Sequence, residues 1–169
     1  MNPTLQVEPD SFRKRTVMEI GLEIASLAGL LYSYVLAIVP PEGSENSYPV
    51  HFGITGEPDA WGSSTAMFLL PILGTIFYLL LTILRRMPHK FNYPVPLSER
   101  NVQRQVRLAL LTLAWVKLEL VWSFTYIHAR SIDVAAGLSA GLGSFFLPLF
   151  LGIIVGTAAI YFLLAFRSR

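Results

Sequence analysis

Long stretches without any charged residue constrain the fold of this chain more than any other feature. They cover residues 24–41, 60–84 and 134–166. An apolar run of about 18 or more residues is typical of a membrane-spanning helix. Hydrophobic residues make up 53% of the chain and charged residues only 14%. This composition argues against a soluble enzyme and a disordered chain, and the lack of cysteine excludes disulfides and thiolate metal sites.

We predict four helices, at residues 16–39, 65–84, 106–127 and 142–166. Backbone polar groups find no water inside a bilayer, so a segment that crosses it must be helical. Each segment is long enough to cross about 30 Å of hydrocarbon. Short connections favour an up-down-up-down bundle. The expected fold is therefore an all-α integral membrane protein, with residues 1–169 forming a single domain.

The basic residues indicate the orientation of this bundle. Eleven of the thirteen Lys and Arg residues lie in the tail (1–15), in the basic segment and the helix start that follows it (85–107), or at the C-terminus. The loop at 40–64, by contrast, is acidic. Lys and Arg are enriched in cytoplasmic loops. We therefore expect a multi-pass protein of the cell membrane with both termini in the cytoplasm, a cytoplasmic segment at 85–105 and an outer loop at 40–64.

Charged residues within spans are costly and are candidates for function. Glu23 lies in the first predicted helix, and Lys117 lies about 15 Å into the third. The flexible Lys117 side chain points back toward the cytoplasmic side, to a depth near that of Glu23. We expect these two residues to form an ion pair. The pair is either a structural clamp or part of a proton or ion path.

Glu119 is the third charged residue expected inside the membrane. It lies two positions from Lys117, and residues with that spacing face different directions on a helix. One interpretation makes Glu119 a proton-titrating or ligand-facing group. The other makes it a structural carboxyl group that is hydrogen-bonded to Ser33, Tyr34 or Ser123.

Small residues recur every four positions on two of the predicted helices. They let another backbone approach closely, either within the bundle or across a homodimer; we favour packing within the bundle. The residues are Gly21, Ala25, Gly29, Ser33, Ala37, Gly152 and Gly156.

Three arginines follow a predicted helix cap at Ser98 and share one helix face: Arg100, Arg104 and Arg107. A basic face next to the membrane attracts anionic lipid headgroups. We expect this contact rather than a protein or nucleotide partner, since no glycine-rich phosphate loop accompanies it. The net charge of +2 gives no support for nucleic-acid binding.

The outer loop contains a distinctive motif, P-x-H-F followed by G-x-x-D-x-W-x-S. Its residues are Pro49, His51, Phe52, Gly56, Asp59, Trp61 and Ser63. The motif resembles a bacterial and archaeal membrane domain of unknown function, found at the N-terminus of SdpI-type toxin-immunity proteins. The resemblance implies a small membrane protein of uncharacterised role.

His51 and Asp59 are the chemical pair of this loop. We expect them to hydrogen-bond to each other or to the loop backbone. A divalent metal is the weaker alternative, because no H-x-x-x-H spacing fixes a site. Catalysis with Ser63 as nucleophile has no nucleophile elbow behind it. We expect no catalytic residue and no cofactor.

The leading hypothesis is a non-enzymatic membrane protein. Its outer loop would bind a peptide, lipid or toxin-like ligand, or the chain would serve as an accessory subunit of a membrane complex. The alternative is a small ion- or proton-coupled transporter that uses Glu23, Lys117 and Glu119. A membrane metal-dependent enzyme is the third possibility.

Overall fold

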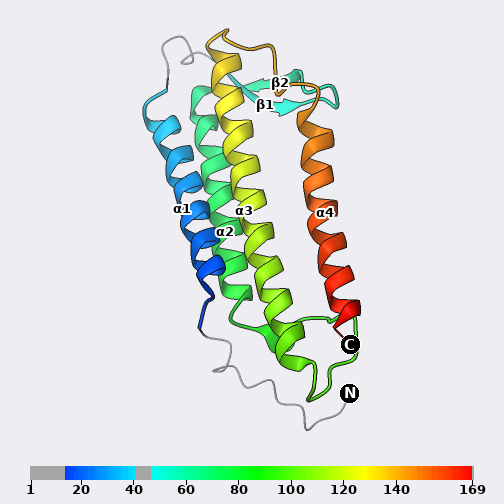
Figure 1. The fold of residues 1–169 in the computed structure, drawn as a ribbon. Coiled ribbons are helices and arrows are strands. Elements are labelled where there is room, and N and C mark those ends of the chain that lie inside the picture. The colour runs from blue at the N-terminus through cyan, green and yellow to red at the C-terminus, as the bar shows by residue number, and fades with distance from the viewer. Residues whose placement is uncertain (1–13, 41–46, 169) are drawn as a thin grey trace.

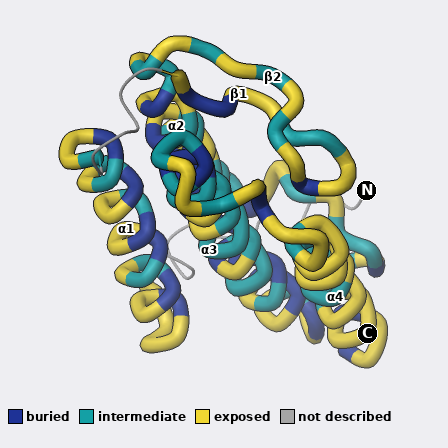
Figure 2. Tube along the Cα trace, turned by 90° about the horizontal axis from the view of Figure 1, so that it is seen from above, coloured by how far each residue is buried: buried dark blue, intermediate teal, exposed yellow. Residues whose placement is uncertain are grey.

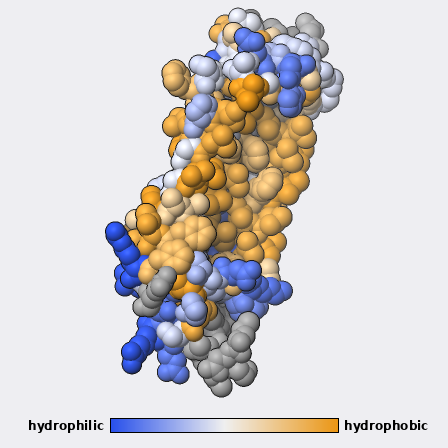
Figure 3. Space-filling view, turned by 90° about the vertical axis from the view of Figure 1, so that its right-hand side faces the viewer, coloured by the Kyte–Doolittle hydropathy of each residue, from blue (hydrophilic) through white to orange (hydrophobic). Residues whose placement is uncertain are grey.

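The computed structural model describes residues 14–40 and 47–168. Four long helices run side by side in alternating directions (Figure 1). They are α1 (Val17–Ile38), α2 (Leu69–Leu84), α3 (Val102–Ala135) and α4 (Phe146–Arg167). Each is long and apolar enough to cross a membrane when α2 is joined to the 3₁₀ turn η2 (Ser64–Phe68) that precedes it. The predicted four-helix class is confirmed, and Figure 3 shows the apolar band between two polar ends.

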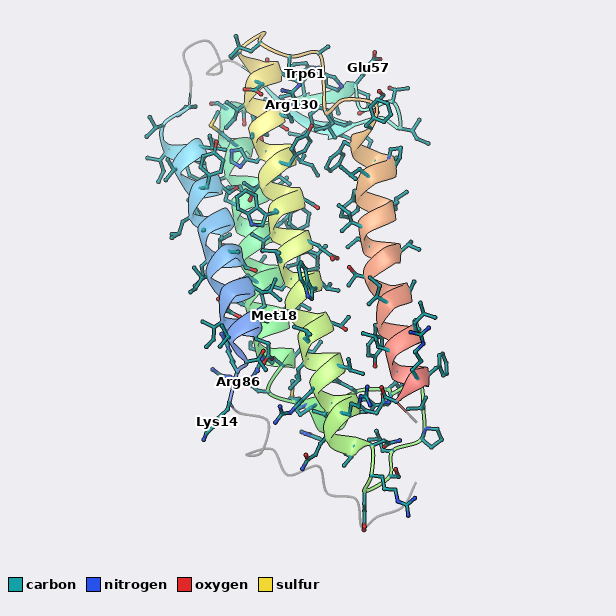
Figure 4. All side chains as sticks on the ribbon, viewed as in Figure 1. Lys14, Met18, Glu57, Trp61, Arg86 and Arg130 are labelled. Atoms are coloured by element: carbon teal, nitrogen blue, oxygen red, sulfur yellow. The ribbon has the colours of Figure 1, made fainter. Side chains whose placement is uncertain are left out.

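The two ends of the bundle differ in what they carry. Val17 begins α1 and Arg167 ends α4 at the same end, which we call the terminal end (Figure 1). The opposite end carries a small sheet, and we call it the hairpin end. In Figure 4, Trp61 and Arg130 mark the hairpin end, while Arg86 marks the terminal end.

The outer loop folds into a two-stranded antiparallel sheet that the sequence analysis did not predict. β1 (Tyr48–Phe52) pairs with β2 (Pro58–Gly62), and the register is irregular on both sides of His51. Pro49 favours extended backbone, and Gly56 takes a φ of 83°, a conformation that suits glycine. The expected all-α fold therefore needs this correction. The stretch 41–46 of the predicted loop lies outside the described residues, as do most of the tail (1–13) and Arg169.

Helix α1 packs its small-residue face against α3 (Figure 2). The Trp122 indole Nε1 donates to the Ala25 carbonyl at 3.0 Å, and the Thr125 hydroxyl donates to the Gly29 carbonyl at 3.0 Å. A Cβ on Gly29 would lie only 3.0 Å from the Trp122 ring. Packing within the bundle is thus confirmed for Gly29, whereas Gly21 at the start of this stripe is exposed.

Helix α4 lies at the edge of the bundle and packs mainly against α3 (Figure 2). Only 6% of its most apolar window is buried, compared with 17–28% in the other spans. A Cβ on Gly152 or Gly156 would meet no atom within 4 Å. The expectation that these two glycines pack within the bundle is therefore wrong.

Several helix limits also differ from the prediction. The third helix continues to Ala135 instead of ending at residue 127, because its last turns are buried beneath the sheet. Ser98 does not cap it; the Ser98 amide instead donates to Asn101 Oδ1 at 2.8 Å, and the helix begins at Val102. Helix α4 begins at Phe146, four residues later than expected.

Candidate functional site

Tyr48 anchors the sheet to the bundle. Its side chain is 2% exposed and packs against Met67 and Ile132. Its ring meets the His128 ring edge-on, with the centroids 6.1 Å apart. Burial raises the pKa of Tyr48 to about 12, which keeps the hydroxyl neutral at physiological pH.

His51 and Asp59 face each other across the two strands. His51 Nδ1 and Asp59 Oδ1 lie 2.5 Å apart, so the predicted contact is confirmed. The two side chains are 69% and 52% exposed, so the pair lies on the surface of the hairpin. Ser63 bonds instead to the Thr65 hydroxyl at 2.7 Å, so the structure does not bring Ser63, His51 and Asp59 together as a hydrogen-bonded triad.

The loop between α3 and α4 is fastened to the hairpin. Arg130 donates to the Gly141 carbonyl at 3.1 and 3.2 Å, and it pairs with Asp133 at 3.0 Å. The next amide in the chain, Leu142, donates to the Gly56 carbonyl at 2.8 Å. The Gly56 turn of the motif therefore sets the place where α4 starts.

A cavity of about 570 Å³, which we call the hairpin pocket, lies between the sheet, α3 and α4. Phe52 and Gly56 of the motif line its hairpin wall, together with His51. Phe124 from α3 and Phe150 from α4 line the helical walls. Apart from His51 and Ser123, no lining side chain is polar, so the pocket suits an apolar group.

A second cavity of about 650 Å³ flanks the contact between α3 and α4, and we call it the aromatic pocket. Phe146 borders both pockets and stacks on Tyr126, with ring centroids 5.0 Å apart. Within the described part of the chain, Glu119 is the only charged residue that lines the aromatic pocket. The contact between α3 and α4 thus has an apolar hollow on each side.

Glu119 bonds to the fourth helix. The Thr157 hydroxyl donates to Glu119 Oε1, while Oε2 is buried with no hydrogen-bond partner among the described residues. The prediction that Glu119 is hydrogen-bonded to Ser33, Tyr34 or Ser123 is therefore wrong. Ser33 bonds instead to His128 Nδ1 at 3.2 Å.

Glu23 and Lys117 lie at the centre of a polar cluster toward the terminal end. Lys117 Nζ lies 2.9 Å from Glu23 Oε2, so the predicted ion pair is confirmed. Arg15 also contacts this oxygen at 3.1 Å, and the Tyr78 hydroxyl donates to Oε1. Lys117 donates further to Thr82 at 2.8 Å. Both charges are fully engaged, as in a structural clamp that joins α1, α2 and α3.

The three predicted lipid-facing arginines, Arg100, Arg104 and Arg107, are exposed. All three line a cavity of about 520 Å³, which we call the basic pocket. The cavity lies at the terminal end between the starts of α1 and α3 and the end of α2.

Sequence reasoning missed two buried polar residues of α3. Gln105 is fully buried and donates to the carbonyls of Ala165 and Ser168 at 2.9 and 3.2 Å, which satisfies the last turn of α4. His128 is also fully buried, beneath Tyr48. No apolar run singled these residues out, since Gln105 lies in the polar stretch 100–107 and His128 lies two residues before Arg130.

The residues that the structure describes contain no group of three or more His, Cys, Asp and Glu side chains that could share a metal ion. The His51–Asp59 pair therefore stands without a third such ligand nearby. A structural metal site typically uses four ligands, and a catalytic zinc site three protein ligands.

Comparison with known proteins gives one match. Residues 46–75 match the model of a domain of unknown function, DUF1648. No curated protein and no solved structure matches the chain. The matched segment includes both strands, the whole P-x-H-F and G-x-x-D-x-W-x-S motif, and the start of α2. The chain is thus a membrane-type four-helix protein that carries, over this segment, a sequence similar to a domain of unknown function.

Proposed function

We propose that this chain is a non-enzymatic membrane protein that binds the apolar part of a lipid-like ligand in the hairpin pocket. The observation that carries this proposal is which parts of the chain form the walls of the pocket. The hairpin, which lies within the family-matched segment, supplies one wall, and α3 and the largely exposed α4 supply the others. The hydrogen bond from the Leu142 amide to the Gly56 carbonyl holds the hairpin against the loop that leads into α4.

The composition of the walls favours a lipid-like ligand. Besides its aromatic residues, the lining contains aliphatic side chains such as Ile54, Ile127 and Leu147. Burying apolar surface contributes roughly 25 cal/mol per Å² to the free energy of binding. The exposed His51–Asp59 pair lies on the same hairpin and offers hydrogen bonds to a polar headgroup. We further propose that the hairpin end faces outward, as the distribution of Lys and Arg indicates.

Photolabelling tests the proposal. The protein in phosphatidylcholine vesicles would be irradiated with a fatty acid that carries a diazirine on its chain, and the labelled peptides would be identified by mass spectrometry. We expect labelling of the hairpin and of the first turns of α4. Ser123→Phe places a ring in the hollow and should reduce this labelling.

Val155→Phe is the matched control, because it adds the same ring on a 64% exposed position of α4 that lines neither pocket. Uniform labelling along all helices, unaffected by Ser123→Phe, would contradict the proposal. Protection of the pocket by an apolar peptide but not by unlabelled lipid would point to a peptide ligand instead.

An accessory-subunit role is the second candidate, and the exposure of α4 favours it. A partner helix, or the same helix of a second copy, could pack on the open Gly152 face. A cysteine introduced at Gly152 tests this role in native membranes. A crosslink to a defined partner would support it, and labelling by lipid-soluble reagents alone would contradict it.

Transport remains the alternative with a single favourable observation, the unpartnered Oε2 of Glu119 beside the aromatic pocket. A proton-coupled transporter should lose proton uptake in proteoliposomes on Glu119→Gln. We also propose that the chain is related to the N-terminal domain of SdpI-type proteins. The family match supports this over residues 46–75.

A further inference from the structure

We propose that the basic pocket binds the phosphate-bearing headgroup of an anionic membrane lipid. This site is separate from the hairpin pocket, because it lies at the opposite end of the bundle. Lys14 and Arg85 line it together with Arg104 and Arg107 of α3 and with Arg100, which lies before the start of α3 and so does not share its helix face as predicted. Figure 4 shows Lys14 at this end.

The charge balance of the pocket favours an anion. Among the described residues, Glu19 is the only acidic one in its lining, and Glu19 Oε1 already accepts from Arg85 at 2.7 Å. Four lining cations therefore have no carboxylate partner among the described residues. They are Lys14, Arg100, Arg104 and Arg107.

The arrangement of these cations adds to the argument. Arg104 and Arg107 are three residues apart on α3, so their side chains start on the same face. Like charges at this spacing repel, and a bound anion relieves that repulsion. The planar guanidinium groups match the oxygens of a phosphate, which accept paired hydrogen bonds.

The inner wall of the basic pocket favours a lipid over a free phosphate as the bound ligand. Leu108, Leu110 and Leu111 line it alongside the arginines, in the first turns of α3. A free phosphate has no apolar part to cover these leucines, whereas the first carbons of an acyl chain do. Basic pockets between membrane helices bind anionic headgroups in this way.

Native mass spectrometry and thermal melting test the site. Purified protein in a neutral detergent would be titrated separately with phosphatidylglycerol, cardiolipin, phosphatidylcholine and inorganic phosphate. We expect the two anionic lipids to bind and to raise the melting temperature. Each arginine near the surface adds about fivefold in affinity, so R104Q/R107Q should weaken binding about 25-fold.

Arg86→Gln is the matched control, because Arg86 is an exposed cation at the same end that does not line the pocket (Figure 4). We expect it to bind within twofold of wild type. An equal loss for Arg86→Gln, or no loss for R104Q/R107Q, would overturn the site. Equal protection by inorganic phosphate would overturn the lipid assignment. If R104Q/R107Q fails to fold, the single variants R104Q and R107Q should each weaken binding about fivefold, and unchanged binding in both would overturn the site.

Discussion

Gly141 lies directly against the backbone of Gly56, 85 positions earlier in the chain. A Cβ built on Gly141 would come within 2.2 Å of the Gly56 carbonyl oxygen, a distance that no real Cβ contact shows. That same oxygen accepts from the Leu142 amide at 2.8 Å. The hairpin and the loop that leads into α4 therefore depend on glycine at position 141, and the hairpin pocket depends on this junction.

Gly141→Ala should separate the loop from the hairpin. The added methyl group forces a backbone shift, because the opposing atom belongs to backbone and cannot rotate away. We expect a loss of about 1–3 kcal/mol in the free energy of unfolding in detergent. Labelling in the hairpin pocket should fall together with stability.

Gly152→Ala is the control for this substitution, since a Cβ there meets nothing within 4 Å. We expect it to stay within about 1 kcal/mol of wild type, or to gain stability, because alanine favours helix. Equal losses for the two variants would show that the Gly141–Gly56 contact has no special importance.

Tyr48→Ala should destabilise the hairpin more than any exposed substitution in the motif. The substitution removes a ring that is 2% exposed and packed against His128, Met67 and Ile132. Truncation of a buried aromatic residue costs about 3–5 kcal/mol. Hydrogen exchange of the hairpin amides should report local opening, and unchanged protection in β1 would contradict this anchoring role.

Asp59→Ala should have a much smaller effect. The His51–Asp59 bond is short, but both side chains are exposed, and exposed pairs contribute about 0–1 kcal/mol. We expect a slightly lower melting temperature and normal insertion into membranes. A drop as large as that of Tyr48→Ala would show that the pair supports the fold of the hairpin.

The sequence determined the membrane architecture because a bilayer leaves few choices. Long charge-free stretches can cross it only as helices. The Lys117 and Glu23 side chains were expected at similar depths in the bilayer, which predicted the ion pair that the structure shows. The hairpin was harder to predict, because β1 and β2 are short, and Pro49 and irregular pairing obscure strand alternation.

The exposed position of α4 could not be deduced from its sequence. Its G-x-x-x-G pattern is compatible with packing against any neighbour, and lipid is as apolar as a helix partner. The Glu119–Thr157 bond shows the same limit, because a polar residue in one span does not reveal which other span it faces. Such choices depend on tertiary packing between segments that are distant in the chain.

The Glu23–Lys117 pair predicts an asymmetry between its two single variants. Lys117 is 2% exposed. Glu23→Leu removes its carboxylate partner and leaves it the hydrogen bond to Thr82 and the contact with the Tyr78 ring, whose centroid is 4.7 Å from Nζ. With Lys117→Met, Glu23 keeps Arg15 and the Tyr78 hydroxyl. Lys117→Met therefore does not leave Glu23 without a cationic partner.

Glu23→Leu should therefore cost about 3–5 kcal/mol, the usual effect of leaving a buried charge without its partner. Lys117→Met should cost less, and the double variant should cost less than the sum of the two. Thermal and denaturant unfolding in detergent would measure all four proteins in one double-mutant cycle. Additive losses would mean that the two groups are not coupled, because a direct pair shows an interaction energy of about 0.5–3 kcal/mol in such a cycle.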